Sequence, residues 1–145
     1  MIHVTRIGST YWKEQGGNPL AKDAEPREAI VNLRAKLERI HEYWKPKIIA
    51  ELNDSYVKLV KLKGEFVWHH HESEDELFQV LKGHLRIDLR DGAIHLREGE
   101  LAVIPRGTEH RPVAAEEVHV LLLEPKSTVN TGQVRGERTV DAEWI

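Results

Sequence analysis

The sequence predicts an all-β protein, a barrel or a sandwich, with one helix ahead of the sheet. From residue 48 to residue 124, short runs rich in β-forming residues follow one another, and no helical pattern separates them. Pairs that end in glycine, which favour turns, divide these runs. The pairs are Lys63-Gly64, Lys82-Gly83, Asp91-Gly92, Glu98-Gly99 and Arg106-Gly107. Many short strands divided by glycine turns are typical of an antiparallel sandwich or barrel.

Residues 1–47 are expected to form an extended arm followed by a helix. Residues 1–17 have mixed polarity and run into a turn cluster, so the arm is expected there. The helix is predicted from Ala21 to Tyr43, because Pro26 suits a first turn and Pro46 ends the element. An apolar stripe at helical spacing is expected to serve core or dimer packing, with a partner-binding helix as the alternative. Its members are Ile30, Leu33, Leu37, Ile40 and Trp44.

The period of the hydrophobic pattern changes after Pro46, where the strands are expected to begin. Asn53-Asp54-Ser55 lies between the first two runs and predicts a hairpin. The expected strands are Ile48–Leu52, Tyr56–Leu62, Glu65–His71, Glu76–Leu81, His84–Leu89, Ala93–Leu96, Leu101–Ile104, His110–Ala114 and Val118–Leu123. Residues 125–145 are polar and are expected to form a tail over the barrel. We therefore expect one domain, made of an arm and helix (1–47), a barrel (48–124) and a tail (125–145).

Composition excludes several classes of function. There is no cysteine, so disulfides and thiol chemistry are excluded, and any metal must be held by His, Asp or Glu. The net charge is −3 and mixed along the chain, which argues against a nucleic-acid partner. No window approaches 18 apolar residues, so no membrane association is expected. These features predict a cytoplasmic protein.

The stretch from Trp68 to Phe78 carries the clearest chemical signal. Alternate residues of a strand share a face, so His69 and His71 are expected to point the same way and His70 the other way. After a turn, Glu76 opens the returning strand close to the two histidines and offers an anionic oxygen. Phe78 and Val80 continue the face of Glu76 as an apolar wall.

A second stretch, from Gly99 to His110, is expected to complete the group. Pro105 and Gly107 form a turn that directs the next strand back to the same cavity, so His110 is the candidate for a further nitrogen ligand. Imidazoles with one carboxylate suit a divalent transition ion (Fe, Mn, Ni, Cu, Co or Zn), and are a poor match for Ca or Mg. A site that keeps a coordination position open is catalytic in type.

The two stretches resemble the two sequence motifs of the cupins, and the resemblance covers residues 48 to 124. The first motif is matched by Gly64, His69-His70-His71, Glu76 and Gly83. The second is matched by Gly99, Pro105-Arg106-Gly107 and His110. Two positions depart from the family pattern: four residues rather than five separate Gly64 from His69, and Ala114 stands where cupins often have asparagine. Neither position is a metal ligand in the family.

The resemblance implies a double-stranded β-helix, or jelly-roll, barrel of the small cupin 2 type. It implies metal ligation by His69, His71, Glu76 and His110, and a homodimer. The expected function is a metal-dependent enzyme, dioxygenase-like or isomerase-like, that acts on a small molecule, with Glu76 as a catalytic residue. Chains like this one are similar to proteins called mannose-6-phosphate isomerase-like, yet no sugar-phosphate site is visible here. The alternatives are a non-catalytic cupin that binds a small molecule or a metal, and, less favoured, a sensory module.

Several other side chains near the motifs have a structural and a functional interpretation. Arg106 and Arg111 are expected as surface charges, with binding of an anionic substrate group as the alternative. Phe66 and Trp68 fall on the face opposite His69 and are expected in sheet packing or dimer contacts. His84, His95 and His119 are expected at the surface or in the core, with a role in the cavity as the alternative. Glu72, Glu74 and Asp75 are expected to form a solvated turn, with one of them at the rim of the pocket as the alternative.

Overall fold

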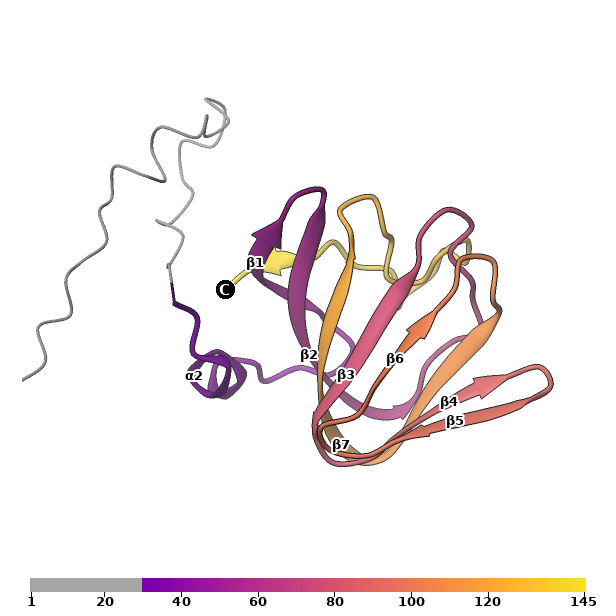
Figure 1. Cartoon of the computed structure of the whole chain (residues 1–145), viewed down its shortest axis with the longest axis horizontal. Coiled ribbons are helices and arrows are strands. Elements are labelled where there is room, and N and C mark those ends of the chain that lie inside the picture. Colours follow the sequence, from indigo (N-terminus) through magenta and orange to yellow (C-terminus); the bar gives the residue numbers. More distant parts are fainter. Residues whose placement is uncertain (1–29) are drawn as a thin grey trace, which may run out of the picture. The chain divides into compact units, whose positions relative to one another are not determined.

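A computed structural model describes residues 30–145, and within them the protein is built almost entirely of β-strands (Figure 1). The predicted fold class is therefore confirmed. The elements are α2 (Leu33–Glu38), β1 (Lys47–Leu52), β2 (Ser55–Glu65), β3 (Glu76–Lys82), β4 (Leu85–Leu89), β5 (Gly92–Leu96), β6 (Leu101–Ile104), β7 (His110–Pro125) and β8 (Glu143–Trp144). No helix among these residues is long and apolar enough to cross a membrane.

Strand β7 organises the sheet because it pairs with three other strands. One edge of β7 runs antiparallel to β2, from Glu65↔Val113 to Ser55↔Pro125. The other edge pairs first with β4 and then, nearer its end, with β3. The path β5-β4-β7-β2-β1-β8 and the β6-β3 pair therefore diverge from one common strand. The result is the curved, barrel-like sheet that Figure 1 shows.

The core lies on the inner side of this curved sheet. Buried positions alternate along β3, β4 and β7, so every second side chain points inward. The buried cluster consists of Val60, Leu62, Phe78, Val80, Leu85, Ile87, Leu96, Ile104, Ala114, Val118, Val120 and Leu122. Its members come from six strands, so the core joins the whole sheet.

Three boundaries differ from the sequence prediction. Lys63-Gly64 is not a turn: β2 continues through it, and Gly64 (φ 85°) pairs with Ala114 at the edge of a bulge, where the register with β7 shifts. The strand expected over Glu65–His71 is absent beyond Glu65, and only an isolated bridge joins His69 to His110. The two strands expected between residues 110 and 123 are one strand, β7, because β2 pairs with both halves.

The predicted helix is shorter than expected within the described residues, and its part before residue 30 lies outside them. Asn32 caps α2 by accepting a hydrogen bond from the backbone N–H of Ala35, at 3.0 Å. The helix ends at Glu38, and Trp44 adopts a left-handed conformation (φ 63°). The backbone and indole N–H groups of Trp44 donate to carbonyls of β2, which a continued helix could not allow.

Residues after Pro125 return along the barrel. Strand β8 pairs in parallel with β1, through Lys47↔Glu143 and Ile48↔Trp144. The backbone N–H of Ile145 also donates to the carbonyl of Ile48, at 3.1 Å. The segment between Pro125 and β8, coloured yellow in Figure 1, crosses the loop that carries the histidines. The division of the chain at residues 47 and 124 stays a prediction.

Candidate metal centre

A reciprocal backbone contact brings the two histidine segments together. The N–H of His69 donates to the carbonyl of His110 at 3.0 Å, and the N–H of His110 donates to the carbonyl of His69 at 2.9 Å. Just beyond, Gly107 donates to the carbonyl of His71 at 2.7 Å. The irregular loop before β3 is thus held against the start of β7.

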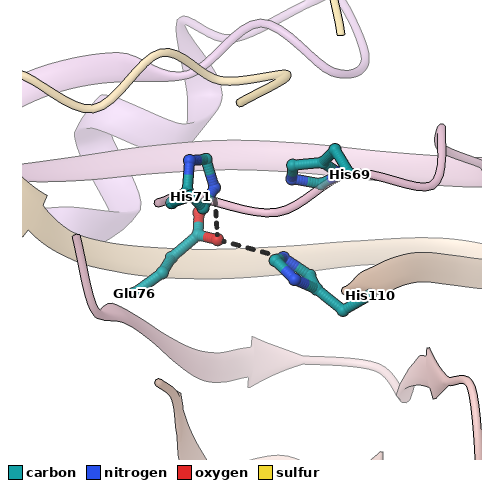
Figure 2. A group of neighbouring side chains, drawn as sticks. All are labelled: His69, His71, Glu76 and His110. Atoms are coloured by element: carbon teal, nitrogen blue, oxygen red, sulfur yellow. Dashed lines mark hydrogen bonds and ion pairs between the residues drawn. The ribbon is translucent and has the colours of Figure 1, made fainter. Parts of the chain in front are cut away.

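Four side chains converge at this contact, as Figure 2 shows. One donor atom from each of His69, His71, Glu76 and His110 lies within 4.8 Å of the others, and all four residues are buried. Glu76 Oε2 is central, 3.1 Å from His71 Nε2 and 3.3 Å from His110 Nε2. Opposite ligands of an ion at 2.0–2.2 Å lie about 4.0–4.4 Å apart. The group therefore needs only a small contraction to hold one ion.

Two of the imidazoles are oriented by the same local device. His69 Nδ1 lies 2.9 Å from the carbonyl of Val67, and His110 Nδ1 lies 2.8 Å from the carbonyl of Thr108. A carbonyl can only accept, so each Nδ1 carries a proton and each Nε2 is the nitrogen that faces the other ligands. His110 Nε2 is buried and makes no hydrogen bond. A buried imidazole nitrogen without a hydrogen bond, beside a carboxylate, suits a metal ligand.

The charge states also suit a metal ligand set. Burial and the neighbouring His110 lower the pKa of His69 to about 4, so its imidazole is neutral at pH 7. Burial acts to raise the pKa of Glu76, but His110 and His71 outweigh it and hold this pKa below its ordinary value. Glu76 is therefore an anion among imidazoles, which is the state that ligation requires.

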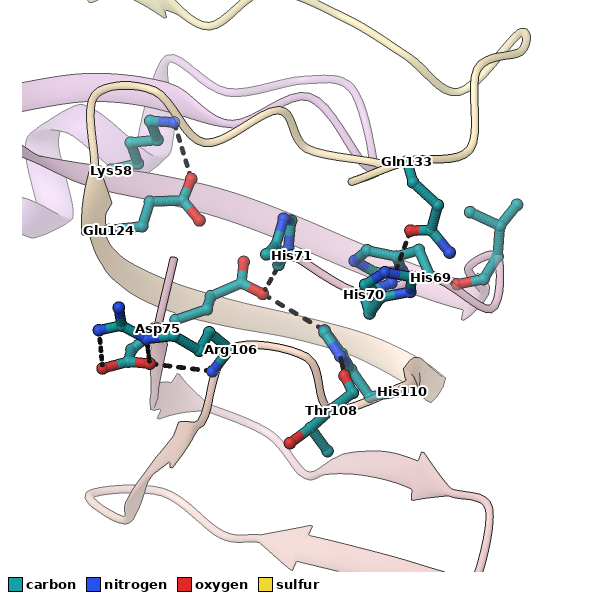
Figure 3. A network of polar contacts seen from close by, with 12 residues as sticks. Lys58, His69, His70, His71, Asp75, Arg106, Thr108, His110, Glu124 and Gln133 are labelled. Atoms are coloured by element: carbon teal, nitrogen blue, oxygen red, sulfur yellow. Dashed lines mark hydrogen bonds and ion pairs between the residues drawn. The ribbon is translucent and has the colours of Figure 1, made fainter. Parts of the chain in front are cut away.

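A buried ion pair between Lys58 and Glu124, which Figure 3 shows, lies next to the Glu76 carboxylate. Lys58 Nζ donates to Glu124 Oε1 at 2.7 Å, and both side chains are almost fully buried. Burial and the adjacent Glu76 carboxylate raise the pKa of Glu124 well above its ordinary value. The sequence prediction missed both residues, because Lys58 and Glu124 alternate with apolar neighbours on long strands and belong to no motif.

A small pocket opens beside the metal group, and most of its wall is apolar. Its polar members are His69, Glu76, Glu124 and Asn130. The apolar members are Trp44, Pro46, Val60, Leu62, Phe66, Phe78, Pro112 and Leu122. Phe66 was expected in sheet packing but lines this pocket, with its ring 5.4 Å from that of His69 and stacked on Trp44. The loop that replaces the expected strand explains the difference, since strict alternation fails there.

The other side chains considered from sequence lie outside the metal group. Arg106 pairs with Asp75, and Arg111 pairs with Asp88, so neither lines the pocket. Trp68 stacks under the guanidinium of Arg90 at 3.8 Å. His70 donates its backbone N–H to Gln133 Oε1 at 2.8 Å, and its imidazole is not part of the metal group.

The segment after β7 packs closely over the histidine loop. Gly132 has φ 56°, and a Cβ placed there would lie 2.0 Å from the carbonyl oxygen of His70. The Asn130 amide binds the chain at Arg138 and Val140, through bonds of 2.7 and 3.0 Å. Residues 130–140 therefore form a backbone cover over His69 and His70.

Fold and site together define a small antiparallel β-barrel protein with a buried candidate centre of three histidines and one glutamate. A family model described as a cupin domain matches residues 57–124. With the relatives below, this shows that the chain belongs to the cupin superfamily, as its motifs predicted.

Three relatives illustrate the range of similarity. An uncharacterized protein, YdbB of Bacillus subtilis, is 42% identical over 81 residues, which cover 55% of this chain and 72% of the relative. The crystal structure of a cupin-2 domain containing protein from Shewanella frigidimarina is 47% identical with a TM-score of 0.66, and covers 66% of this chain and 94% of that one. Acireductone dioxygenase of Bacillus licheniformis is 30% identical over 95 residues, or 61% of this chain and only 53% of that enzyme.

Gly132→Ala is expected to destabilise the protein by roughly 1–3 kcal/mol, because an L side chain is strained at this φ and meets the His70 carbonyl. Urea unfolding measures the change. Gly136→Ala is the matched control, since nothing lies within 4 Å of a Cβ there. Equal effects of the two substitutions would contradict the close packing of this cover.

Glu124→Met is expected to cost roughly 3–5 kcal/mol of unfolding free energy, because it leaves the Lys58 ammonium buried without its carboxylate partner. The double variant Lys58→Met, Glu124→Met removes both polar groups and should regain much of this loss. A double-mutant cycle by urea unfolding gives the coupling. Additive losses would show that the pair does not act as a unit.

Proposed function

We propose that this cupin is a metal-dependent enzyme that acts on a small, largely apolar molecule, and that its chemistry is of the dioxygenase type. The observation that carries the proposal is the convergence of four buried donor atoms, two of which belong to residues that line an apolar pocket, His69 and Glu76. His69, His71, Glu76 and His110 would hold a divalent transition ion (Fe, Mn, Ni, Cu, Co or Zn). When bound, such an ion activates dioxygen or polarises a coordinated oxygen of the substrate.

The composition of the pocket favours oxidation over isomerisation of a sugar phosphate. Among the described residues that line it there is no lysine or arginine, and a phosphate group would need such a cation. The dioxygenase found among the relatives supports the same direction, although the match spans about half of that enzyme. An isomerase-like reaction on an uncharged carbonyl compound remains the second candidate.

The residues of this chain have separable roles in the proposal. His69 and His110 present their Nε2 atoms to the site, because backbone carbonyls hold their Nδ1 protons. Glu76 both completes the ligand set and lines the pocket, so we propose it as the catalytic residue that contacts the bound molecule. Phe66, Phe78 and Trp44 exclude water and receive the apolar part of the substrate.

His71→Ala is expected to remove bound metal, because it deletes one of four ligands and leaves Glu76 with a single close imidazole. Elemental analysis of the untagged protein measures metal per chain, with about one ion expected in the wild type. His70→Ala is the matched control, since this neighbour lies outside the group.

The assay for activity is oxygen uptake by the metal-loaded protein with small apolar compounds that carry two adjacent oxygen donors. Metal binding without uptake or turnover of any compound would favour the alternative, a non-catalytic cupin that binds a small molecule or a metal. Absence of metal in the wild type, with no change in His71→Ala, would contradict the proposed centre.

A homodimer is also proposed, together with a cytoplasmic location that stays a prediction. The register of β6, β3 and β7 places Val103, Leu77 and Leu123 side by side on one outward face, with Leu101 and Leu121 in the next row. Leu101 and Val103 are 55% and 51% exposed, which is unusual for neighbouring apolar residues on an edge strand. A second copy that covers this face would remove them from water.

Val103→Lys is expected to shift the protein from dimer to monomer, because it places a charge on this outward face. Sedimentation velocity measures the change. Leu52→Lys is the control, since Leu52 is 56% exposed but lies at the end of β1, away from these strands. A wild-type monomer, or equal dissociation of both variants, would contradict the proposal that this face forms the dimer contact.

A further inference from the structure

A second group of imidazoles lies at the corner where β4 and β5 begin and end. His84 immediately precedes β4, and His95 is the fourth residue of β5. Their rings are nearly parallel (13°), and His95 Nδ1 lies 3.3 Å from His84 Nε2. Both residues are exposed, in contrast to the buried histidines of the candidate centre.

The register of the β4–β5 hairpin explains why the two rings meet. Leu85 pairs with Leu96 and Arg86 pairs with His95, so His95 shares the outward face with Arg86. His84 lies one residue before the buried Leu85 and therefore points outward as well. The two histidines are diagonal neighbours across the strands, which is within reach of long side chains.

Two charged side chains, Arg86 and Glu98, come from residues close to the pair. The Arg86 guanidinium comes from the same face as the two histidines. It donates from Nε to Asp88 Oδ1 at 2.7 Å, so it points along β4 toward Asp88. Glu98 adds a carboxylate in the same corner, where its Oε1 accepts the N–H of Gly83 at 3.0 Å. These two charged side chains therefore do not repel a cation from the imidazole pair.

The separation of the two nitrogens matches a shared metal ion. Two ligands at 2.0–2.1 Å from a tetrahedral ion are about 3.3–3.4 Å apart. His95 Nδ1 and His84 Nε2 lie at 3.3 Å, so exposed side chains need only rotate for both lone pairs to face one ion. Imidazole nitrogens select transition ions over Ca²⁺ and Mg²⁺.

We infer that His84 and His95 form a second, surface site for a divalent transition ion such as Zn²⁺, Ni²⁺ or Cu²⁺. The protein supplies two ligands, and water fills the remaining positions, so the ion exchanges freely. Six residues of β3, 77–82, separate this corner from Glu76, a distance of roughly 20 Å along the strand. The surface site is thus distinct from the buried centre and does not rest on the proposed function.

Retention of the untagged, chelator-treated full chain on immobilised Ni²⁺ tests accessibility directly, because buried imidazoles cannot reach an ion held on a resin. The wild type is expected to be retained, and both His84→Ala and His95→Ala should elute at clearly lower imidazole concentration. His41→Ala removes another exposed histidine and should elute with the wild type. Equal retention of the wild type and both pair variants would overturn the inference.

Equilibrium dialysis against Zn²⁺ tests stoichiometry. The double variant His84→Ala, His95→Ala is expected to bind one ion fewer per chain than its parent, in the wild-type background and in the His71→Ala background alike. This difference does not depend on whether the buried centre binds metal. The test therefore distinguishes absence of the surface site from absence of the buried centre. An unchanged ion count in the double variant would show that the imidazoles only hydrogen-bond to each other.

Discussion

The reciprocal hydrogen bonds between His69 and His110 are the contact on which the candidate centre depends. They join an irregular loop to the first residue of β7 at the only ladder position that this loop occupies. The backbone of each histidine is fixed by the other, and each ring is fixed by a carbonyl two residues earlier. Rotation of the imidazoles is thereby restricted before any ion arrives, which lowers the entropy cost of assembling the centre.

Much of the site could be predicted from the sequence because its signal is local. His69, His71 and Glu76 lie within eight residues, and the turn at Pro105 and Gly107 fixes where His110 returns. Trp44, Lys58 and Glu124 could not be found in this way, because only the β2–β7 ladder and the turn after α2 bring them to the pocket or, for Lys58, to Glu124 at its wall. Strand boundaries failed where Gly64 makes a bulge, since glycine in sequence favours a turn and a bulge alike.

The buried pair behind Glu76 gives the centre a charge balance that its four ligands alone do not have. Two buried carboxyl groups, those of Glu76 and Glu124, lie next to each other, and Lys58 donates to the second of them. A divalent ion held by the four ligands would add positive charge on the other side of Glu76. The carboxyl pair thus lies between a lysine and a site for a metal ion.

The pairing of β7 with both β4 and β3 has a consequence for shape. His110 opens this strand and Glu124 lies one residue before its end, yet both side chains meet the same carboxylate, that of Glu76. A straight strand of 16 residues would hold its ends roughly 50 Å apart. Strand β7 must therefore curl back on itself, with the exposed residues Ala115–Glu117 at the bend. The curvature at this bend, which lies far from the site along the strand, therefore sets the distance between the two ends of β7 that contact Glu76.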